Sequence, residues 1–263
     1  FASTVSGVDL IVGAKTGSLN LLLYSVFRIG SPTDNISWQA YREIADSDDV
    51  AWAIPISLGD SHEGYRVVGT THAFFDHFSF GKKRRLAFSE GEAFEGTFDA
   101  VLGSEVASAL GYSVGSEIIL AHGLASTSFT KHDNQPFVVV GVLAPTGTPV
   151  DQTIHVRLEG IEAMHAGGST VPIGAFAPGN APDTDFSEPE SITAFMLGLK
   201  SRMSTFNVQR QINQFAGEPL MAILPGVALS ELWQMMSMFE NVLRLISALV
   251  LLAAVLGMGA VLL

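Results

Sequence analysis

The chain ends in its longest apolar run, residues 245–263, which contains no charged side chain and a single polar one, Ser247. A helix rises about 1.5 Å per residue, so this run predicts a helix of roughly 28 Å, close to the ~30 Å hydrocarbon core of a bilayer. The whole segment 229–263 lacks proline, and its only two glycines lie near its end. This pattern predicts one continuous helix that crosses water first and then enters lipid. Because the chain starts at Phe1 and stops inside this run, we expect it to be a fragment.

Apolar runs near the start of the chain predict a βαββ unit. Residues 8–12 form a short apolar run before a glycine-containing turn, which is typical of a buried strand. Residues 37–46 place apolar side chains at threefold spacing after a serine, which predicts a helix with that serine as its N-cap. Residues 50–58 and 65–71 then predict a β-hairpin. Pro55 indicates that the first of these two strands lies at an edge or contains a bulge.

The middle of the chain predicts shorter elements separated by glycines. Four strands are expected, at residues 100–102, 117–121, 137–143 and 153–156. Residues 104–110 predict a helix that begins with Ser104 as N-cap and ends at Gly111. Residues 167–189 are rich in Gly, Pro, Ala and Asp and are expected to form a loop. This region is therefore interpreted as a β-rich subdomain.

The pattern strand, helix, strand returns at residues 193–199, 203–215 and 219–224 and mirrors the opening segment. We therefore predict an α+β protein in which a β-rich subdomain is inserted into a discontinuous mixed α/β subdomain. The predicted boundaries are 1–80 and 191–225 for the two halves of the mixed subdomain, 81–190 for the insertion and 226–263 for a stalk and transmembrane helix.

The net charge of the chain disfavours one class of function. The chain has 14 Lys+Arg against 26 Asp+Glu, a formal net charge of −12, which disfavours general binding to nucleic acid. The one basic cluster is KKRR at residues 82–85. It is expected to form a solvated hairpin tip, with contact to lipid headgroups or an acidic partner as the alternative. The phenylalanines just before it are expected in the core.

Cysteine is absent, which is compatible with either a reducing or an oxidising compartment.

Histidines are the strongest candidates for chemistry. His122, His132 and Asp133 flank a polar segment, and imidazole and carboxylate groups brought together by folding would bind zinc. The alternative is that these histidines, with His155 and His165 further on, lie in solvated loops. The sequence GAKTG after the first strand lacks the glycine that a phosphate-binding loop places directly before its lysine. We therefore expect no catalytic or cofactor-binding residue in this chain.

The segment before the apolar run predicts an amphipathic helix. Its apolar side chains fall on one stripe, opposite Glu231, Gln234 and Glu240. The stripe is formed by Leu232, Trp233, Met236, Phe239 and Leu243. It is expected either to pack on the chain's own domain or to pair with the same helix of a second copy.

Five short motifs occur in an order that resembles the periplasmic core of MacB-like ABC transporter permeases, a group that also carries an FtsX-like membrane domain and includes LolC/E-like proteins. The motifs are DLIVGAK at 9–15, AVLGSEV at 100–106, GYSVG at 111–115, PFVVVGVL at 136–143 and TGTPVD at 146–151. The resemblance covers nearly the whole chain and includes the helix that enters the membrane. It implies a porter-like α/β subdomain with a β-rich insertion, in agreement with the division above.

The resemblance also implies a function. The domain would lie in the periplasm on a bacterial inner membrane, in a permease dimer whose separate cytoplasmic ABC ATPase binds ATP and Mg²⁺. It would couple ATP hydrolysis to export or release of a lipoprotein, a peptide or a small amphiphile, with a periplasmic adaptor or cargo protein as a further partner. The alternative is a mechanotransmission module that regulates a periplasmic enzyme, as FtsX-like proteins do. A third hypothesis is a membrane-tethered metal sensor that uses His122 and His132.

Overall fold

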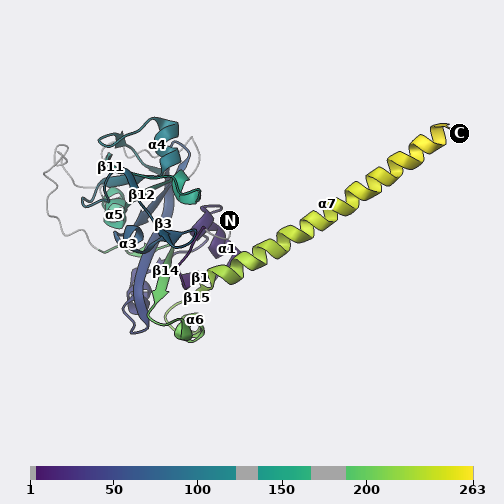
Figure 1. The fold of residues 1–263 in the computed structure, drawn as a ribbon. Helices are drawn as coiled ribbons and strands as arrows, with labels where there is room; N and C mark the ends of the chain where they lie inside the picture. The colour runs from purple at the N-terminus through teal and green to yellow at the C-terminus, as the bar shows by residue number, and fades with distance from the viewer. Residues whose placement is uncertain (1–3, 123–135, 167–187, 263) are drawn as a thin grey trace.

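The computed structural model describes residues 4–122, 136–166 and 188–262 of the chain. A mixed sheet of eleven described strands forms the body, and the 38-residue helix α7 (Pro225–Leu262) projects away from it (Figure 1). The strand order is β15-β1-β14-β3-β4-β12-β8-β11-β7, with β10 beside β3 and β9 beside β11. The predicted combination of an α/β sheet core and a long C-terminal apolar helix is therefore confirmed.

One half of the sheet joins the two ends of the chain. Strand β1 (Leu10–Ala14) lies between β14 (Ala194–Leu199) and β15 (Leu220–Ile223) and is antiparallel to both. Strand β14 pairs in turn with β3 (Val50–His62), also antiparallel. Residues far apart in the sequence thus form a single layer, as the mirrored opening and closing segments indicated.

The other half of the sheet contains the middle of the chain. Strand β3 forms the predicted hairpin with β4, β12 runs parallel to β4, and β11 runs parallel to β8. Their bounds, with the short strands of this half, are β4 (Tyr65–Thr70), β7 (Phe88–Gly91), β8 (Asp99–Leu102), β9 (Glu117–Ile118), β10 (Ala121–His122), β11 (Phe137–Leu143) and β12 (Thr153–Arg157). The predicted subdomain boundaries at residues 80 and 190 stay a prediction.

Strand β3 belongs to both halves, which explains how it accommodates a proline. Its residues up to Ile56 pair with β14, and those from Ser57 pair with β4. Pro55 is opposite Phe195 of β14, before the pairing with β4 begins. The Thr70 hydroxyl donates a hydrogen bond of 2.7 Å to the Pro55 carbonyl oxygen. β3 is thus an inner strand of the sheet, but Pro55 lies in a stretch paired on one side only, where its missing N–H breaks no ladder bond.

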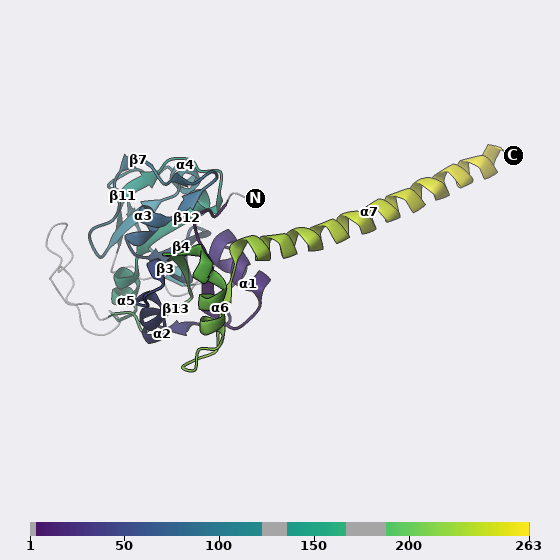
Figure 2. The same cartoon turned by 60° about the horizontal axis from the view of Figure 1, so that its bottom comes forward.

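Helices cover both faces of the sheet. On one face lie α1, the π-helical turn η1, α3 and the base of α7, whose apolar side chains form one core cluster. On the other face α2 and α6 cover the first half (Figure 2), and α4 and α5 cover the second. Their bounds are α1 (Ser18–Leu22), η1 (Leu23–Phe27), α2 (Trp38–Ala45), α3 (Ala73–His77), α4 (Ser104–Leu110), α5 (Leu158–Ala166) and α6 (Thr205–Asn213).

Short elements complete the body. Two-stranded ladders pair β2 with β13 and β5 with β6, and two 3-10 turns precede β12 and α6. Their bounds are β2 (Ile36–Ser37), β5 (Ser79–Phe80), β6 (Arg84–Arg85), β13 (Ser191–Ile192), η2 (Pro149–Gln152) and η3 (Arg202–Ser204). The predicted helix 203–215 is therefore split into η3 and α6.

The capping predictions had mixed outcomes. Ser37 is the N-cap of α2, and its hydroxyl accepts a hydrogen bond of 3.2 Å from the Ala40 N–H, as predicted. Gly111 ends α4 in the left-handed conformation, with φ of 70°, as predicted. The prediction for Ser104 was wrong, because Gly103 is the N-cap of α4. A Cβ at Gly103 would lie 2.3 Å from the Val150 carbonyl oxygen, so a serine does not fit at the cap position.

Candidate functional site

The base of α7 is the mechanical connection between the body and the membrane-facing helix. Ala228 and Leu229 are buried in the core cluster formed with α1 and η1. The Ser18 hydroxyl at the start of α1 donates a hydrogen bond of 2.8 Å to a Glu231 carboxylate oxygen of α7. The first two turns of α7 are thus held on α1 and the core by packing and by a polar contact.

Beyond this base the predicted apolar stripe of α7 is exposed. Leu232 is half-buried, and Trp233, Met236, Phe239 and Leu243 are 50%, 55%, 66% and 63% exposed. The alternative that the stripe packs on the chain's own domain is therefore not met at Met236, Phe239 and Leu243, which are largely exposed. Pairing with a second copy stays a prediction. Exposed apolar stripes of this length are unusual on a monomer and mark an interaction surface.

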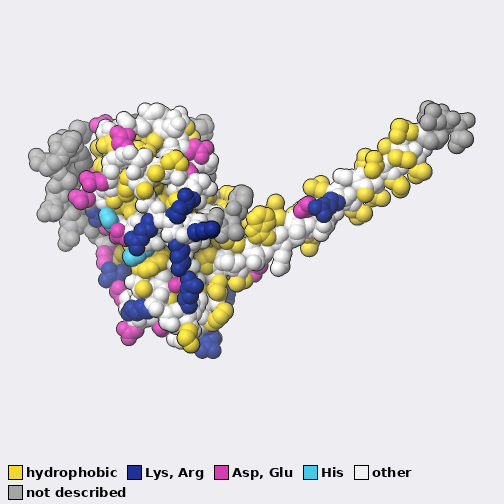
Figure 3. Space-filling model, viewed as in Figure 1, with side chains coloured by type: hydrophobic (Ala, Val, Ile, Leu, Met, Phe, Trp, Pro, Cys, Tyr) yellow, Lys and Arg dark blue, Asp and Glu magenta, His cyan; other side chains and the backbone are white. Residues whose placement is uncertain are grey.

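The upper part of α7 has the length and composition of a membrane span. It is the one helix in the described ranges that is long and apolar enough to cross a bilayer, with a mean hydropathy of 2.1. Figure 3 shows its apolar side chains projecting freely into the surroundings. The last charged pair before it is Glu240 and Arg244, one turn apart and 2.5 Å from oxygen to nitrogen. The polar segment thus ends where the apolar run of the sequence begins.

The predicted metal site lies outside what the structure describes. His132 and Asp133 fall in the gap between residues 122 and 136, and the side chain of His122 at the edge of that gap is not described either. Across the described ranges, no group of three or more His, Asp or Glu side chains is arranged to hold a metal ion. The metal site at His122, His132 and Asp133 therefore stays a prediction.

His155 was expected in a solvated loop, and this expectation was wrong. It lies in the middle of β12, is 0% exposed, and stacks on Phe74 with ring centroids 4.7 Å apart. Burial, together with the nearby Arg28 guanidinium, lowers the pKa of His155 to about 3. The only signal in the sequence that His155 is buried is the strand pattern of the apolar residues on both sides of it. His155 is therefore a neutral core residue at physiological pH.

The basic cluster forms the predicted hairpin tip. Strands β5 and β6 pair around a turn that contains Lys82 and Lys83, and residues 82–85 are all exposed. The Arg84 guanidinium lies over the Phe80 ring, 4.6 Å from its centroid. Phe80 is buried, and so are the three phenylalanines of the preceding segment, Phe74, Phe75 and Phe78, as predicted. Figure 3 shows Lys and Arg side chains gathered on this face of the body.

The glycine-containing segment after residue 12 has a packing role. Gly13 and Ala14 belong to β1 itself, and a Cβ at Gly13 would lie 2.7 Å from the Leu21 side chain of α1. The Lys15 N–H donates a hydrogen bond of 3.0 Å to the Pro219 carbonyl. Gly13 therefore lets α1 pack closely on the sheet, and the predicted turn starts after Ala14.

A pocket between η1 and the β3–β4 hairpin was not predicted from the sequence. We call it the arginine pocket; its volume is about 420 Å³, and it is lined by residues 27–30, residues 64–66, Pro149 and Gln152. Arg28 closes η1 in the left-handed conformation, with φ of 61°, and Arg66 comes from β4. The two arginines are 38 positions apart in the sequence, and the packing of η1 on the sheet places Arg28 beside the β3–β4 hairpin that carries Arg66.

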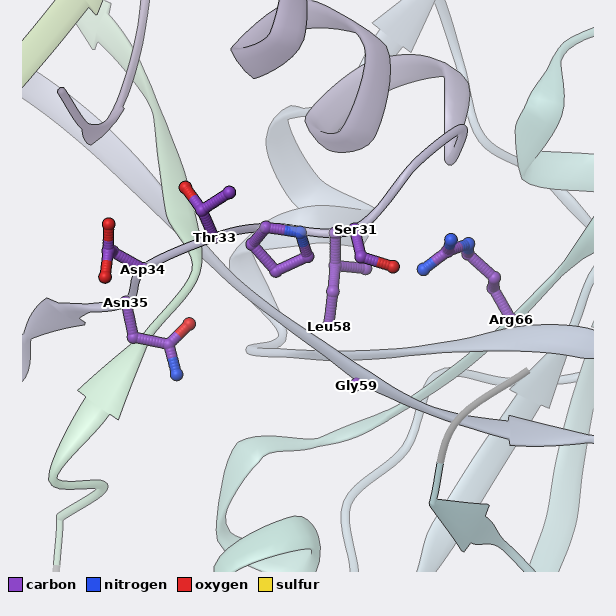
Figure 4. Close-up of a pocket in the computed structure, with 8 residues that line it drawn as sticks. Ser31, Thr33, Asp34, Asn35, Leu58, Gly59 and Arg66 are labelled. Atoms are coloured by element: carbon purple, nitrogen blue, oxygen red, sulfur yellow. The ribbon is translucent and has the colours of Figure 1, made fainter. Parts of the chain in front are cut away.

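Both arginines of this pocket are half-buried. Burial and the neighbouring Arg66 lower the pKa of Arg28 to about 10, and burial lowers the pKa of Arg66. Arg66 also borders a second pocket of about 370 Å³, in which Asp34 lies at the end away from it (Figure 4). The lining of the arginine pocket contains no carboxylate among the described residues.

A family model and one solved structure agree with the fold, and a second solved structure matches more weakly. The family model described as the MacB-like periplasmic core domain matches residues 3–215. The periplasmic region of MacB from Actinobacillus actinomycetemcomitans has a TM-score of 0.53 at 8% identity, covering 87% of this chain and 94% of that one. The extracellular domain of the noncanonic ABC-type transporter YknZ from Gram-positive bacteria has a TM-score of 0.46 at 12% identity, with coverages of 82% and 98%. No curated protein matched the sequence.

Proposed function

Because this chain belongs to the family of MacB-like periplasmic core domains of ABC-type transporter permeases, we propose that it couples ATP hydrolysis in the cytoplasm to movement outside the membrane. The body would lie in the periplasm on the inner membrane of a bacterium. ATP and Mg²⁺ would bind to a separate ABC ATPase. The movement would export or release a lipoprotein, a peptide or a small amphiphile at the outer face of that membrane.

The observation that carries this proposal is the continuity of α7. One uninterrupted helix contains the buried contacts at Ala228 and Leu229, the exposed stripe and the apolar run. A helix without a break transmits a tilt or rotation along its axis, because every backbone hydrogen bond resists bending. Coupling further requires two states of the body whose relative energies are shifted by the ATPase. The contact between α1 and α7 at Ser18 and Glu231 would be where such a shift enters the body.

The same helix supports the proposal of a permease dimer. Two copies of α7 that faced each other through the stripe would cover Met236, Phe239 and Leu243, whose surfaces are largely exposed in the single chain. Burying such side chains contributes about 25 cal/mol per Å² of apolar surface. The stripe supports the dimer as a proposal, with the bilayer surrounding the upper part of each helix.

The alternative function is a regulatory module that recruits and switches a periplasmic enzyme. The exposed hairpin tip at residues 82–85 favours it, because four adjacent basic side chains form a ready contact for an acidic protein. The two functions differ in what stimulates ATP turnover. A diffusible substrate would stimulate a transporter, whereas a protein partner would stimulate a regulatory module.

Interrupting α7 between its base and its membrane span tests the coupling. Gln234→Pro removes a helix hydrogen bond and kinks the stalk, whereas the matched control Gln234→Ala preserves the helix. Both permeases would be purified with their ATPase in lipid nanodiscs, and ATP turnover would be measured with and without a membrane extract. We expect stimulation to be lost in the proline variant and kept in the alanine variant. Equal stimulation of both variants would refute transmission through α7.

A further inference from the structure

The arginine pocket concentrates positive charge that no carboxylate among the described residues pairs with. Arg42, Arg157 and Arg244 each form an ion pair with a carboxylate. Arg28 and Arg66 form none with the described residues, although the chain has 26 acidic side chains and a net charge of −12. Two half-buried guanidinium groups side by side repel each other and lack the solvation that water would give.

The backbone holds both guanidinium groups in place. One nitrogen of Arg28 donates to the Ser25 carbonyl, and one nitrogen of Arg66 donates to the Gly30 carbonyl. A guanidinium has several further N–H donors in a rigid fork, so each group keeps donors for a ligand. The left-handed conformation of Arg28 is uncommon for a residue other than glycine, and here it ends η1 at the pocket.

The other lining residues are neutral. Gln152 contributes an amide, Tyr65 a phenol, and Ile29 and Pro149 apolar surface. A volume of about 420 Å³ falls within the range of ligand pockets and leaves room for an organic group beyond a single oxyanion. The pocket therefore offers a cationic end together with neutral and apolar walls.

We propose that the arginine pocket binds a phosphate group through Arg28 and Arg66. Arginine pairs bind phosphate oxygens through charge-assisted, often bidentate hydrogen bonds, which match the fork of the guanidinium. A bound phosphate also offsets the repulsion between the two arginines. The phosphate is either free phosphate or the headgroup of an anionic amphiphile, and the same pocket chemistry accommodates both. This inference concerns ligand binding and does not depend on the proposed coupling to ATP.

The test is calorimetric titration of the intact chain in micelles of a neutral detergent. One arm uses inorganic phosphate, and the other uses a short-chain phosphatidylglycerol that is soluble as a monomer. We expect saturable binding of at least one probe. Arg66→Gln removes about one charge-assisted interaction and should weaken that binding by roughly tenfold or more. The matched control Arg84→Gln, on the exposed hairpin tip, should bind as the wild type does.

The two arms identify the source of the phosphate. Binding of inorganic phosphate assigns a small anion, whereas binding of the lipid alone assigns a headgroup, and either result supports the proposal. Arg66→Lys, which keeps the charge and loses the fork, should be weakened less than Arg66→Gln and provides the test if the glutamine variant does not fold. The proposal is overturned if neither probe binds below about 10 mM at low salt, where charge attraction is least screened. It is equally overturned if both Arg66 variants bind as tightly as the wild type.

Discussion

Replacing His155 with leucine converts the buried imidazole into an apolar side chain of similar volume. His155 is 0% exposed, and its ring stacks on Phe74 in the core. The variant loses this stacking, which contributes about 0.5–1.5 kcal/mol. It also no longer buries two polar ring nitrogens, a cost of similar size. At pH 7.5, where the imidazole is neutral in both states, we therefore expect the free energies of unfolding to agree within about 1 kcal/mol.

At lower pH the wild type and the leucine variant differ in stability. The folded-state pKa of His155 is lowered to about 3, whereas a histidine in the unfolded chain titrates near pH 6.5. Below pH 6.5 the unfolded chain binds a proton that the folded chain does not, so the stability of the wild type falls as the pH falls. One unit below the unfolded pKa, at pH 5.5, the wild type has lost about 1.4 kcal/mol through this residue. The leucine variant has no imidazole to titrate, so its stability does not fall in this way.

Urea unfolding of the intact chain in detergent, followed by tryptophan fluorescence, measures both proteins at pH 7.5 and 5.5. The predicted result is that the variant gains about 1.4 kcal/mol relative to the wild type between these two pH values. Ile154→Val on the same strand is the control, because it removes a buried methyl group at a cost of about 1 kcal/mol that does not depend on pH. If the difference between wild type and His155→Leu were the same at both pH values, the reasoning from burial to a depressed pKa would be wrong.

Three further substitutions test the local packing and capping of the helices. In Gly103→Ala, the new methyl group would lie 2.3 Å from the Val150 carbonyl oxygen, so we expect a loss of about 2–3 kcal/mol in urea unfolding. Gly59→Ala, where no atom lies within 4 Å of the new methyl group, should change stability by less than about 0.5 kcal/mol, and an equal loss at both sites would contradict the account of the α4 cap. Ser37→Ala removes the N-cap hydrogen bond of α2 and should cost about 1 kcal/mol in the same assay. An unchanged urea midpoint would show that the Ser37 cap does not stabilise the protein.

The elements that the sequence predicted well are those fixed by local patterns. Each of these elements depends on residues that are close together in the sequence. They are the N-cap at Ser37, the hairpin of β3 and β4, the C-cap at Gly111 and the continuous helix α7. The apolar stripe of α7 was likewise predictable from its helical spacing. Ser104 was mistaken for a cap because the exclusion of a side chain at Gly103 comes from Val150, which is distant in sequence.

Features created by long-range pairing were not predictable in the same way. His155 looks like any histidine next to apolar residues until β12 is placed between β4 and β8 in the middle of the sheet. The arginine pocket exists because the β3–β4 hairpin carries Arg66 to the end of η1, where Arg28 lies. Neither arginine belongs to a motif, and no local pattern connects positions so far apart.

The most direct test of the coupling proposal is disulfide formation between the stalks of two permease copies. The chain contains no native cysteine, so Phe239→Cys places a single thiol on the stripe of each copy, and Gln234→Cys places one on the opposite face as the control. Cross-linking would be measured in nanodiscs with the partner ATPase, without nucleotide and with ATP trapped. We predict that the Phe239→Cys variant forms a disulfide whose yield changes with nucleotide, while Gln234→Cys stays uncross-linked. A yield at Phe239 that is the same in both nucleotide states, or that is matched at Gln234, would contradict a stalk that moves with ATP.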